Sequence, residues 1–194
     1  MKKALALISS FAFITITPSG KIVERVLGDS TLQVKSSTVA YADGKIQVQK
    51  GDLVEVEARA NTNDLKIGGS DNKFTIEENG IIATTQFPIT IDANKNTLSV
   101  TTNSGTRTIA ILPYEAATVL MHSKLINKIT GNQINLSENS NGELQYSISG
   151  SRNINLFNVA TITANINSTV SATNGDVIKV DEPQWLKFFG FLFS

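Results

Sequence analysis

Apolar and polar residues alternate through most of the stretch from residue 31 to residue 112. The alternating runs are short and are separated by Gly, Asn and Asp: they read LQVKSS, KIQVQ, LVEVEARA, DLKIGG, KFTIEE, FPITID, TLSVTT and TRTIAIL. A period of two residues is typical of antiparallel strands with one buried and one solvated face. The pattern predicts a β-rich module over 31–112, and a sandwich, a rolled sheet and a short solenoid all satisfy it.

The stretch PYEAATVLMHSKLINK, residues 113–128, breaks this alternation. Pro113 suits a first helical turn, and Glu115 lies near the positive end of a helix dipole. Leu120 flanks a stripe of residues that recur at helical spacing: Tyr114, Ala117, Met121 and Leu125. We expect one helix over 113–128, with this stripe packed on a sheet.

Strand patterns resume after Gly131. They read QINLS, then ELQYSISG, then a long run over 153–170, and finally DVIKV. Asn174-Gly175 lies before the last of them and predicts a tight two-residue hairpin turn. Residues 113–182 therefore form an α+β module, and the expected fold class of the chain is α+β with predominantly antiparallel β structure.

The amino terminus has the layout of a secretory signal over residues 1–20. Lys2 and Lys3 precede an apolar run from Ala4 to about Ile16, and Pro18 follows. The run is too short to span a membrane as a helix. A first buried strand would also explain it. Asn, Ser and Thr supply 56 residues against 34 charged ones, a balance common in extracytoplasmic β proteins. We expect an extracytoplasmic protein, secreted or held in the cell envelope.

Charge and residue types exclude several functions. Lys and Arg equal Asp and Glu at 17 each, with no basic stripe, so we expect no nucleic-acid binding. The absence of Cys removes disulfides, thiolate metal sites and Cys nucleophiles. His122, the one histidine, has no partner motif for a metal or triad. We therefore expect no catalytic residues and no cofactor.

A weak metal candidate lies in the stretch DANKN. Asp92, Asn94 and Asn96 match the D-x-N-x-N start of a calcium loop, but position six is Thr97 and position twelve is Asn103. Closely spaced oxygen ligands suit a hairpin turn equally well.

The segment Val170-Ser171-Ala172-Thr173-Asn174-Gly175-Asp176-Val177-Ile178 resembles the closing hairpin of PepSY-type domains, which carry a V-D-A-x-T-G-E-V turn. Gly175 and Val177 match, Asp176 is an acidic match, and Ser171 departs from the usual Asp. With the preceding helix and strand, the resemblance covers about 113–182. It implies an extracytoplasmic α+β module associated with propeptides and with restraint of peptidases, and it transfers no catalytic residue.

The last residues, 183–194, form an aromatic tail. Its aromatic and apolar residues are Trp185, Leu186, Phe188, Phe189, Phe191 and Phe193. This ending resembles the Pro-Trp-Trp-aromatic tail of uncharacterised prokaryotic envelope proteins, with Gln184 in place of the first Trp. The tail could be a last core element, an interfacial membrane contact, or a docking peptide for a protein partner. A helix of ten residues reaches only about 15 Å and does not span a bilayer.

These observations favour an exported envelope protein that acts by binding or by a structural role, and not by catalysis. The alternative is a PepSY-like regulator or inhibitor of an envelope peptidase.

Overall fold

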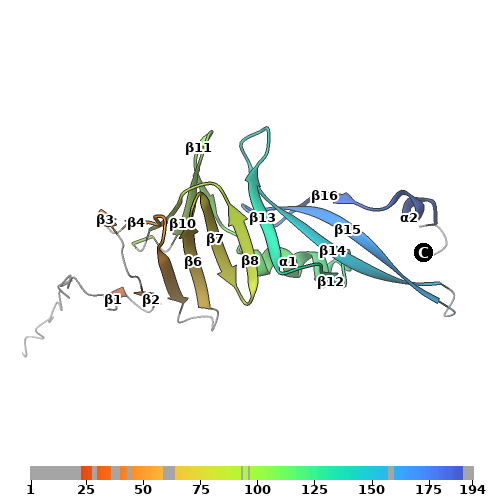
Figure 1. The fold of residues 1–194 in the computed structure, drawn as a ribbon, viewed down its shortest axis with the longest axis horizontal. Helices are drawn as coiled ribbons and strands as arrows, with labels where there is room; N and C mark the ends of the chain where they lie inside the picture. Colours follow the sequence, from red (N-terminus) through yellow and green to blue (C-terminus); the bar gives the residue numbers. More distant parts are fainter. Residues whose placement is uncertain are drawn as a thin grey trace, which may run out of the picture.

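The fold is dominated by β-strands arranged in two sheets (Figure 1). The computed structural model describes residues 23–27, 30–35, 40–42, 45–58, 64–92, 94–95, 97–156 and 160–189. The signal-like segment 1–20 lies outside these ranges. Two short helices accompany the sheets in the described part of the chain: α1 (Pro113–His122) and α2 (Gln184–Phe189).

The larger sheet has eleven strands: β1 (Val23–Leu27), β2 (Ser30–Lys35), β5 (Leu53–Ala58), β6 (Asp64–Ser70), β7 (Lys73–Glu78), β8 (Ile81–Thr85), β12 (Lys128–Ile129), β13 (Gln133–Glu138), β14 (Leu144–Leu156), β15 (Ala160–Ser171) and β16 (Val177–Asp181). Its order is β1-β2-β5-β6-β7-β8-β13-β14-β15-β16, and β12 also pairs with β14. The smaller sheet has the order β11-β10-β9-β4-β3, from β3 (Ala40–Ala42), β4 (Lys45–Gln47), β9 (Ile89–Asp92), β10 (Thr97–Thr102) and β11 (Gly105–Ile109).

The parallel pairing of β8 with β13 joins the amino-terminal strands to the carboxyl-terminal ones. Its register places Ile134 opposite Ala83, and the Thr84 hydroxyl donates to the Ile134 carbonyl at 3.3 Å. The other strand pairs described are antiparallel. One buried cluster therefore contains residues from both sides of residue 113, so the two expected modules share a core, which the sequence left open.

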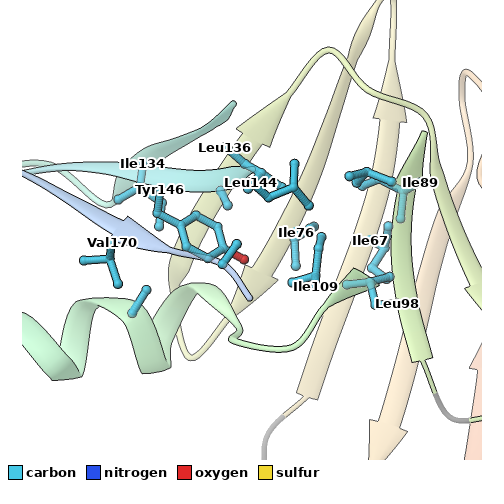
Figure 2. Packing of buried hydrophobic residues seen from close by; sticks show 14 of the residues in the cluster. Ile67, Ile76, Ile89, Leu98, Ile109, Ile134, Leu136, Leu144, Tyr146 and Val170 are labelled. Carbon is cyan, nitrogen blue, oxygen red and sulfur yellow. The ribbon is translucent and has the colours of Figure 1, made fainter. Parts of the chain in front are cut away.

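Two apolar rows face each other inside this core. One crosses the larger sheet through Val54, Ile67, Ile76, Ala83 and Ile134. The other crosses the smaller sheet through Ile46, Ile91, Leu98 and Ile109. All of these side chains are buried in one cluster, part of which Figure 2 shows. In these described strands, the alternating pattern thus predicted the apolar side chains that are buried.

Helix α1 covers the larger sheet beside the smaller one. It contacts β7, β8, β14 and β15, so it lies across the junction between the two halves of the chain. Its buried side chains are Pro113, Ala116, Ala117 and Leu120. The predicted stripe is confirmed for Ala117, which is buried, and for Met121 and Leu125, which pack against the core. It was wrong for Tyr114, which is 37% exposed, and Leu120 is fully buried.

The helix also ends earlier than predicted, at His122. Lys124 adopts a positive φ of 56°, and the chain then turns to run beside β14. There the Asn127 N–H donates to the Ser151 carbonyl at 2.7 Å. Backbone bonds to the edge of β14 therefore replace the last helical turn.

Strands β14 and β15 form the longest hairpin, which extends beyond α1 (Figure 1). We expected a break after Gly150, but β14 continues through Ser151 and Arg152. The predicted two-residue turn at Asn174-Gly175 was also wrong. The Ser171 N–H donates to the Asp176 carbonyl at 2.8 Å, which closes a longer loop, and in that loop Gly175 has a positive φ but Asn174 does not.

Gly150 lets the segment after α1 pack directly on the sheet. A Cβ at this position would lie 2.7 Å from Ile126 Cγ2 and 2.9 Å from Ile126 Cβ. Ile126 is buried in the core, and its branch point cannot swing away as the end of a flexible side chain could. The absence of a side chain at residue 150 is therefore required by the position of Ile126.

We predict that Gly150→Ala lowers the free energy of unfolding by about 1–3 kcal/mol through overpacking. Urea denaturation monitored by circular dichroism measures the loss. In the background Ile126→Ala the same substitution should cost less, because the clashing methyl groups are gone. Equal costs in the two backgrounds would show that the methyl groups of Ile126 are not the obstacle. Ser147→Ala, on the opposite face of β14, is the control.

Tyr146 connects the core to the link between β11 and α1. Its ring is fully buried, and its hydroxyl donates to the Ile111 carbonyl at 2.9 Å. Burial raises the pKa of the phenol far above its usual value of 10.0, and the carboxylates of Glu78 and Glu115 raise the pKa further. In Figure 2 the ring lies in the row of core side chains that runs from Val170 towards Ile109.

The same carboxylates hold the start of α1. Glu78 is buried, and its Oε2 accepts the Tyr114 N–H at 3.0 Å. Glu115 Oε2 accepts the Leu112 N–H at 2.9 Å. Both carboxylates lie at the positive end of the helix dipole, where negative charge is stabilising.

We predict that the folded chain loses stability above about pH 10 because Tyr146 keeps its proton while the unfolded chain releases it. This group contributes a decrease of about 1.4 kcal/mol per pH unit above the unfolded pKa. Tyr146→Phe should remove that slope, and at neutral pH it should cost about 1 kcal/mol through the lost hydrogen bond. Urea denaturation at pH 8 to 11 measures both effects. Tyr114→Phe, at an exposed tyrosine, should keep the slope; an unchanged slope in Tyr146→Phe would contradict the assignment.

Candidate binding surface

One face of β13, β14 and β15 carries uncharged polar side chains at every position. Three come from β13, six from β14 and six from β15, and they point away from the core: Gln133, Asn135, Ser137, Gln145, Ser147, Ser149, Ser151, Asn153, Asn155, Thr161, Thr163, Asn165, Asn167, Thr169 and Ser171. We call this set the polar face. It follows from the two-residue period of the strands, because most of the intervening side chains are buried on the other face.

The register sets polar side chains directly opposite one another. Three cross-strand hydrogen bonds join such pairs: Ser149 Oγ to Asn167 Oδ1 at 2.8 Å, Thr161 Oγ1 to Asn155 Oδ1 at 2.8 Å, and Thr163 Oγ1 to Asn153 Oδ1 at 3.0 Å. These bonds hold the side chains in place. An Asn side chain has two N–H donors and two acceptor sites, so one bond leaves most of this capacity for a ligand.

The polar face is long and has charges at its margins. From residue 145 to residue 155 the exposed positions of β14 extend about 33 Å, at about 3.3 Å per residue. Lys179 and Asp181 of β16 border it on one side and bind each other at 2.7 Å. Lys128 of β12 borders it opposite Ser151. Within the face there is no charge to attract an ionic ligand.

The sequence carries a signal for this surface that the alternation of apolar and polar residues does not reveal. From residue 153 to residue 175 the chain contains no Asp, Glu, Lys, Arg, His or Pro. Such a gap is unusual for solvated strands, which normally carry charges. Alternation predicted a wet face for each strand, but it did not show that the wet faces of three strands lie side by side.

The aromatic tail begins as α2, which lies on the distal part of the β14–β15 hairpin. Leu186 is 5% exposed and forms a small cluster with Ile154 and Ala164, and Trp185 packs against this cluster. Phe188 and Phe189 belong to α2, although their side chains are outside the described part of the structure. Phe191 and Phe193 lie outside the described residues.

An ion pair accompanies this docking. Arg152 of β14 lies with its guanidinium Nη1 3.6 Å from Glu182 Oε1, just before α2. Both side chains are partly exposed, so the ion pair contributes at most modestly to the stability of the docked α2. The first turn of the tail is thus held to the hairpin mainly by Leu186 and Trp185.

The calcium candidate forms a turn. Asp92 Oδ1 accepts the N–H groups of Asn94 at 3.1 Å and of Lys95 at 3.0 Å. These bonds close the β9–β10 hairpin and use one oxygen of the carboxylate. Asn96 lies outside the described residues, so the three expected ligands are not seen together.

The described residues contain no group of three or more His, Cys, Asp or Glu side chains placed to hold a metal ion. His122 is exposed at the end of α1. None of the helices in the described ranges is long and apolar enough to cross a membrane.

Comparison with protein-family models, with curated proteins and with solved structures gave no match.

We predict that Leu186→Ala releases α2 from the hairpin while leaving the main core folded. A buried Leu→Ala change typically costs about 2–5 kcal/mol, but this cluster is separate from the main core, so the loss should be local. Trp185 is the only tryptophan, so its fluorescence reports the change directly. We expect a red-shifted emission at zero denaturant, with a nearly unchanged circular dichroism spectrum.

Leu53→Ala is the matched control, because Leu53 is 53% exposed on β5. It should leave the Trp185 emission unchanged. An unchanged emission in Leu186→Ala would show that Leu186 does not hold α2 in place.

Proposed function

We propose that this chain is an exported cell-envelope protein that acts by binding, and that its polar face contacts a neutral, hydroxyl-rich polymer. The observation that supports this proposal is the extent of the polar face, which presents hydroxyl and amide groups on three adjacent strands. The signal-like residues 1–20 support the location. The proposal assigns no catalytic residue and no cofactor.

The chemistry of the polar face selects among ligand classes. An ionic ligand such as nucleic acid would find no opposite charges within the face. An apolar ligand would bury hydroxyl and amide groups without hydrogen-bond partners, at a cost of about 1–3 kcal/mol for each group. A neutral polysaccharide offers donors and acceptors in return and carries no charge. It is the ligand class that leaves fewest groups unpaired.

The tail provides a second contact in this proposal. Leu186 and Trp185 hold α2 on the hairpin, and the aromatic residues that follow would contact a membrane surface or a protein partner. Aromatic side chains suit both roles, since they are enriched at membrane interfaces and at the centres of protein interfaces. This contact would keep the polar face close to the envelope.

The resemblance to PepSY-type domains supports a second candidate, a regulator of an envelope peptidase. The order of α1 followed by β13, β14, β15 and β16 agrees with the order of a helix and an antiparallel meander. In this proposal residues 31–112 form an amino-terminal β-rich module, and residues 113–182 restrain the peptidase. If this second candidate is right, the purified full chain should slow an envelope protease.

We predict that the purified full chain is retained by insoluble neutral polysaccharides, such as cellulose, chitin or starch granules. Ser147→Glu should reduce the retained fraction, because it places one carboxylate at the centre of the polar face. A bound neutral ligand must then desolvate that charge without a partner. Sedimentation of the polysaccharide followed by quantification of the supernatant measures retention.

Thr106→Glu is the matched control, since it adds the same charge to an exposed position of β11 outside the polar face. It should leave retention unchanged. Failure of the unmodified chain to bind any of the three polysaccharides, or equal retention of the two variants, would contradict the proposed use of this face.

A further inference from the structure

The outer edge of β15 is paired along only part of its length. β16 pairs with residues 167–170 of β15. Among the described residues, no strand pairs with the remaining edge over 160–166. The chain leaves the edge after Asp181, and Leu186 then lies over Ala164 on the inner face.

Alternation identifies the backbone groups that face this open edge. The Ser171 N–H donates outward, to the Asp176 carbonyl. In an antiparallel strand every second residue directs both its N–H and its C=O to the same side. The groups of Thr161, Thr163 and Asn165 therefore face outward, whereas those of Ile162 and Ala164 face β14.

The usual protection of an open edge is absent here. Natural sheets blunt their edges with charged side chains, Pro or bulges, because unpaired backbone groups invite another strand. Residues 160–166 read ATITANI, which contains no charge and no Pro. Ile162 is also 39% exposed, which makes it one of the few exposed large apolar side chains in the described ranges.

We propose that this edge pairs with the same edge of a second copy of the chain, antiparallel and centred on Thr163. A two-fold contact brings the same patch of both copies together, so every charge on it would occur twice in the interface and would have to be paired or desolvated. The neutral sequence removes that obstacle. The inference concerns the edge of β15 and does not rest on the proposed polysaccharide ligand.

The register of the proposed pairing agrees with the chemistry of the hairpin. Centring on Thr163 sets Thr161 opposite Asn165 of the other copy, so that outward-facing backbone groups meet outward-facing ones. Within the hairpin, Thr161 and Thr163 already bond to Asn side chains directly opposite. The same kind of Thr–Asn pair would therefore recur twice across the two-fold axis.

The proposed pairing would also bury apolar surface on the inner face of the sheet. Ile162 of one copy would lie opposite Ala164 of the other, which would cover its exposed part. The contact is limited at one end, because β16 occupies the edge from Asn167 onward. Five residues on each side make a small interface, and we expect weak association that depends on concentration and strengthens where copies are held close together.

Single cysteines test the pairing and its register, because the full chain has no Cys of its own. Directly opposite residues in a hydrogen-bonded antiparallel pair have Cα atoms about 5.5 Å apart, within the range of about 4.4–6.8 Å that a disulfide bridges. Thr163→Cys should therefore form a disulfide-linked dimer under mild oxidation. Residues 161 of the two copies would lie about 13 Å apart, so Thr161→Cys alone should not.

Ser147→Cys is the matched control. It is exposed on the same face, but its strand is paired on both sides with β13 and β15. We expect Thr163→Cys to crosslink about tenfold faster or more, because pairing raises the local concentration of the two thiols. A mixture of Thr161→Cys and Asn165→Cys should crosslink faster than either variant alone.

Equal crosslinking rates for Thr163→Cys and Ser147→Cys would overturn the proposal. The edge of β15 would then be covered by this chain's own residues or by another protein. Fast crosslinking of Thr161→Cys alone would overturn the register. Circular dichroism of each variant shows whether it is folded, and each position is exposed on the polar face. No polysaccharide is present, so the result is independent of the test of the polar face.

Discussion

The parallel pairing between β8 and β13 is the contact on which the rest of the structure depends. Only three residue pairs form it, yet it places Ile134 beside Ala83 and so continues the apolar row of the amino-terminal strands into the carboxyl-terminal ones. Without it, each half would have an apolar sheet face of its own to bury. With it, the larger sheet has one apolar face that continues from β5 to β15.

No single element covers a face of that length. The smaller sheet covers the part over β5 to β8, α1 covers the junction, and α2 covers the distal end of the β14–β15 hairpin. Among the described side chains, the cluster at the distal end contains Ile154, Ala164 and Leu186, with Trp185 packed against them.

Polar groups lie beside the core at the junction because α1 begins there. Its first N–H groups have no partners within the helix, and they lie next to the core. Glu78 and Glu115 accept two of the N–H groups at this start, and Tyr146 donates to the carbonyl of Ile111 just before it. The bonds of Glu78 and Tyr146 each remove the cost of an unpaired polar group next to the core, whereas the bond of Glu115 lies at an exposed position. On the other side of the sheet, β13 to β15 meet solvent with uncharged groups alone, so any recognition there depends on hydrogen bonds and shape.

The sequence by itself determined the local features of this protein. The two-residue alternation over 31–112 identified most strands and their buried sides, and Pro113 with Glu115 marked the start of α1, because these features depend on near neighbours in the chain. The tertiary structure alone decided where α1 ends, since the edge of β14 competes for the backbone groups of the residues after His122. It also decided that β13, β14 and β15 place their polar sides together and that, among the described strands, part of the edge of β15 has no partner. Such surfaces arise from strand order and register between residues distant in sequence, and periodicity within one strand contains no information about which strand lies beside it.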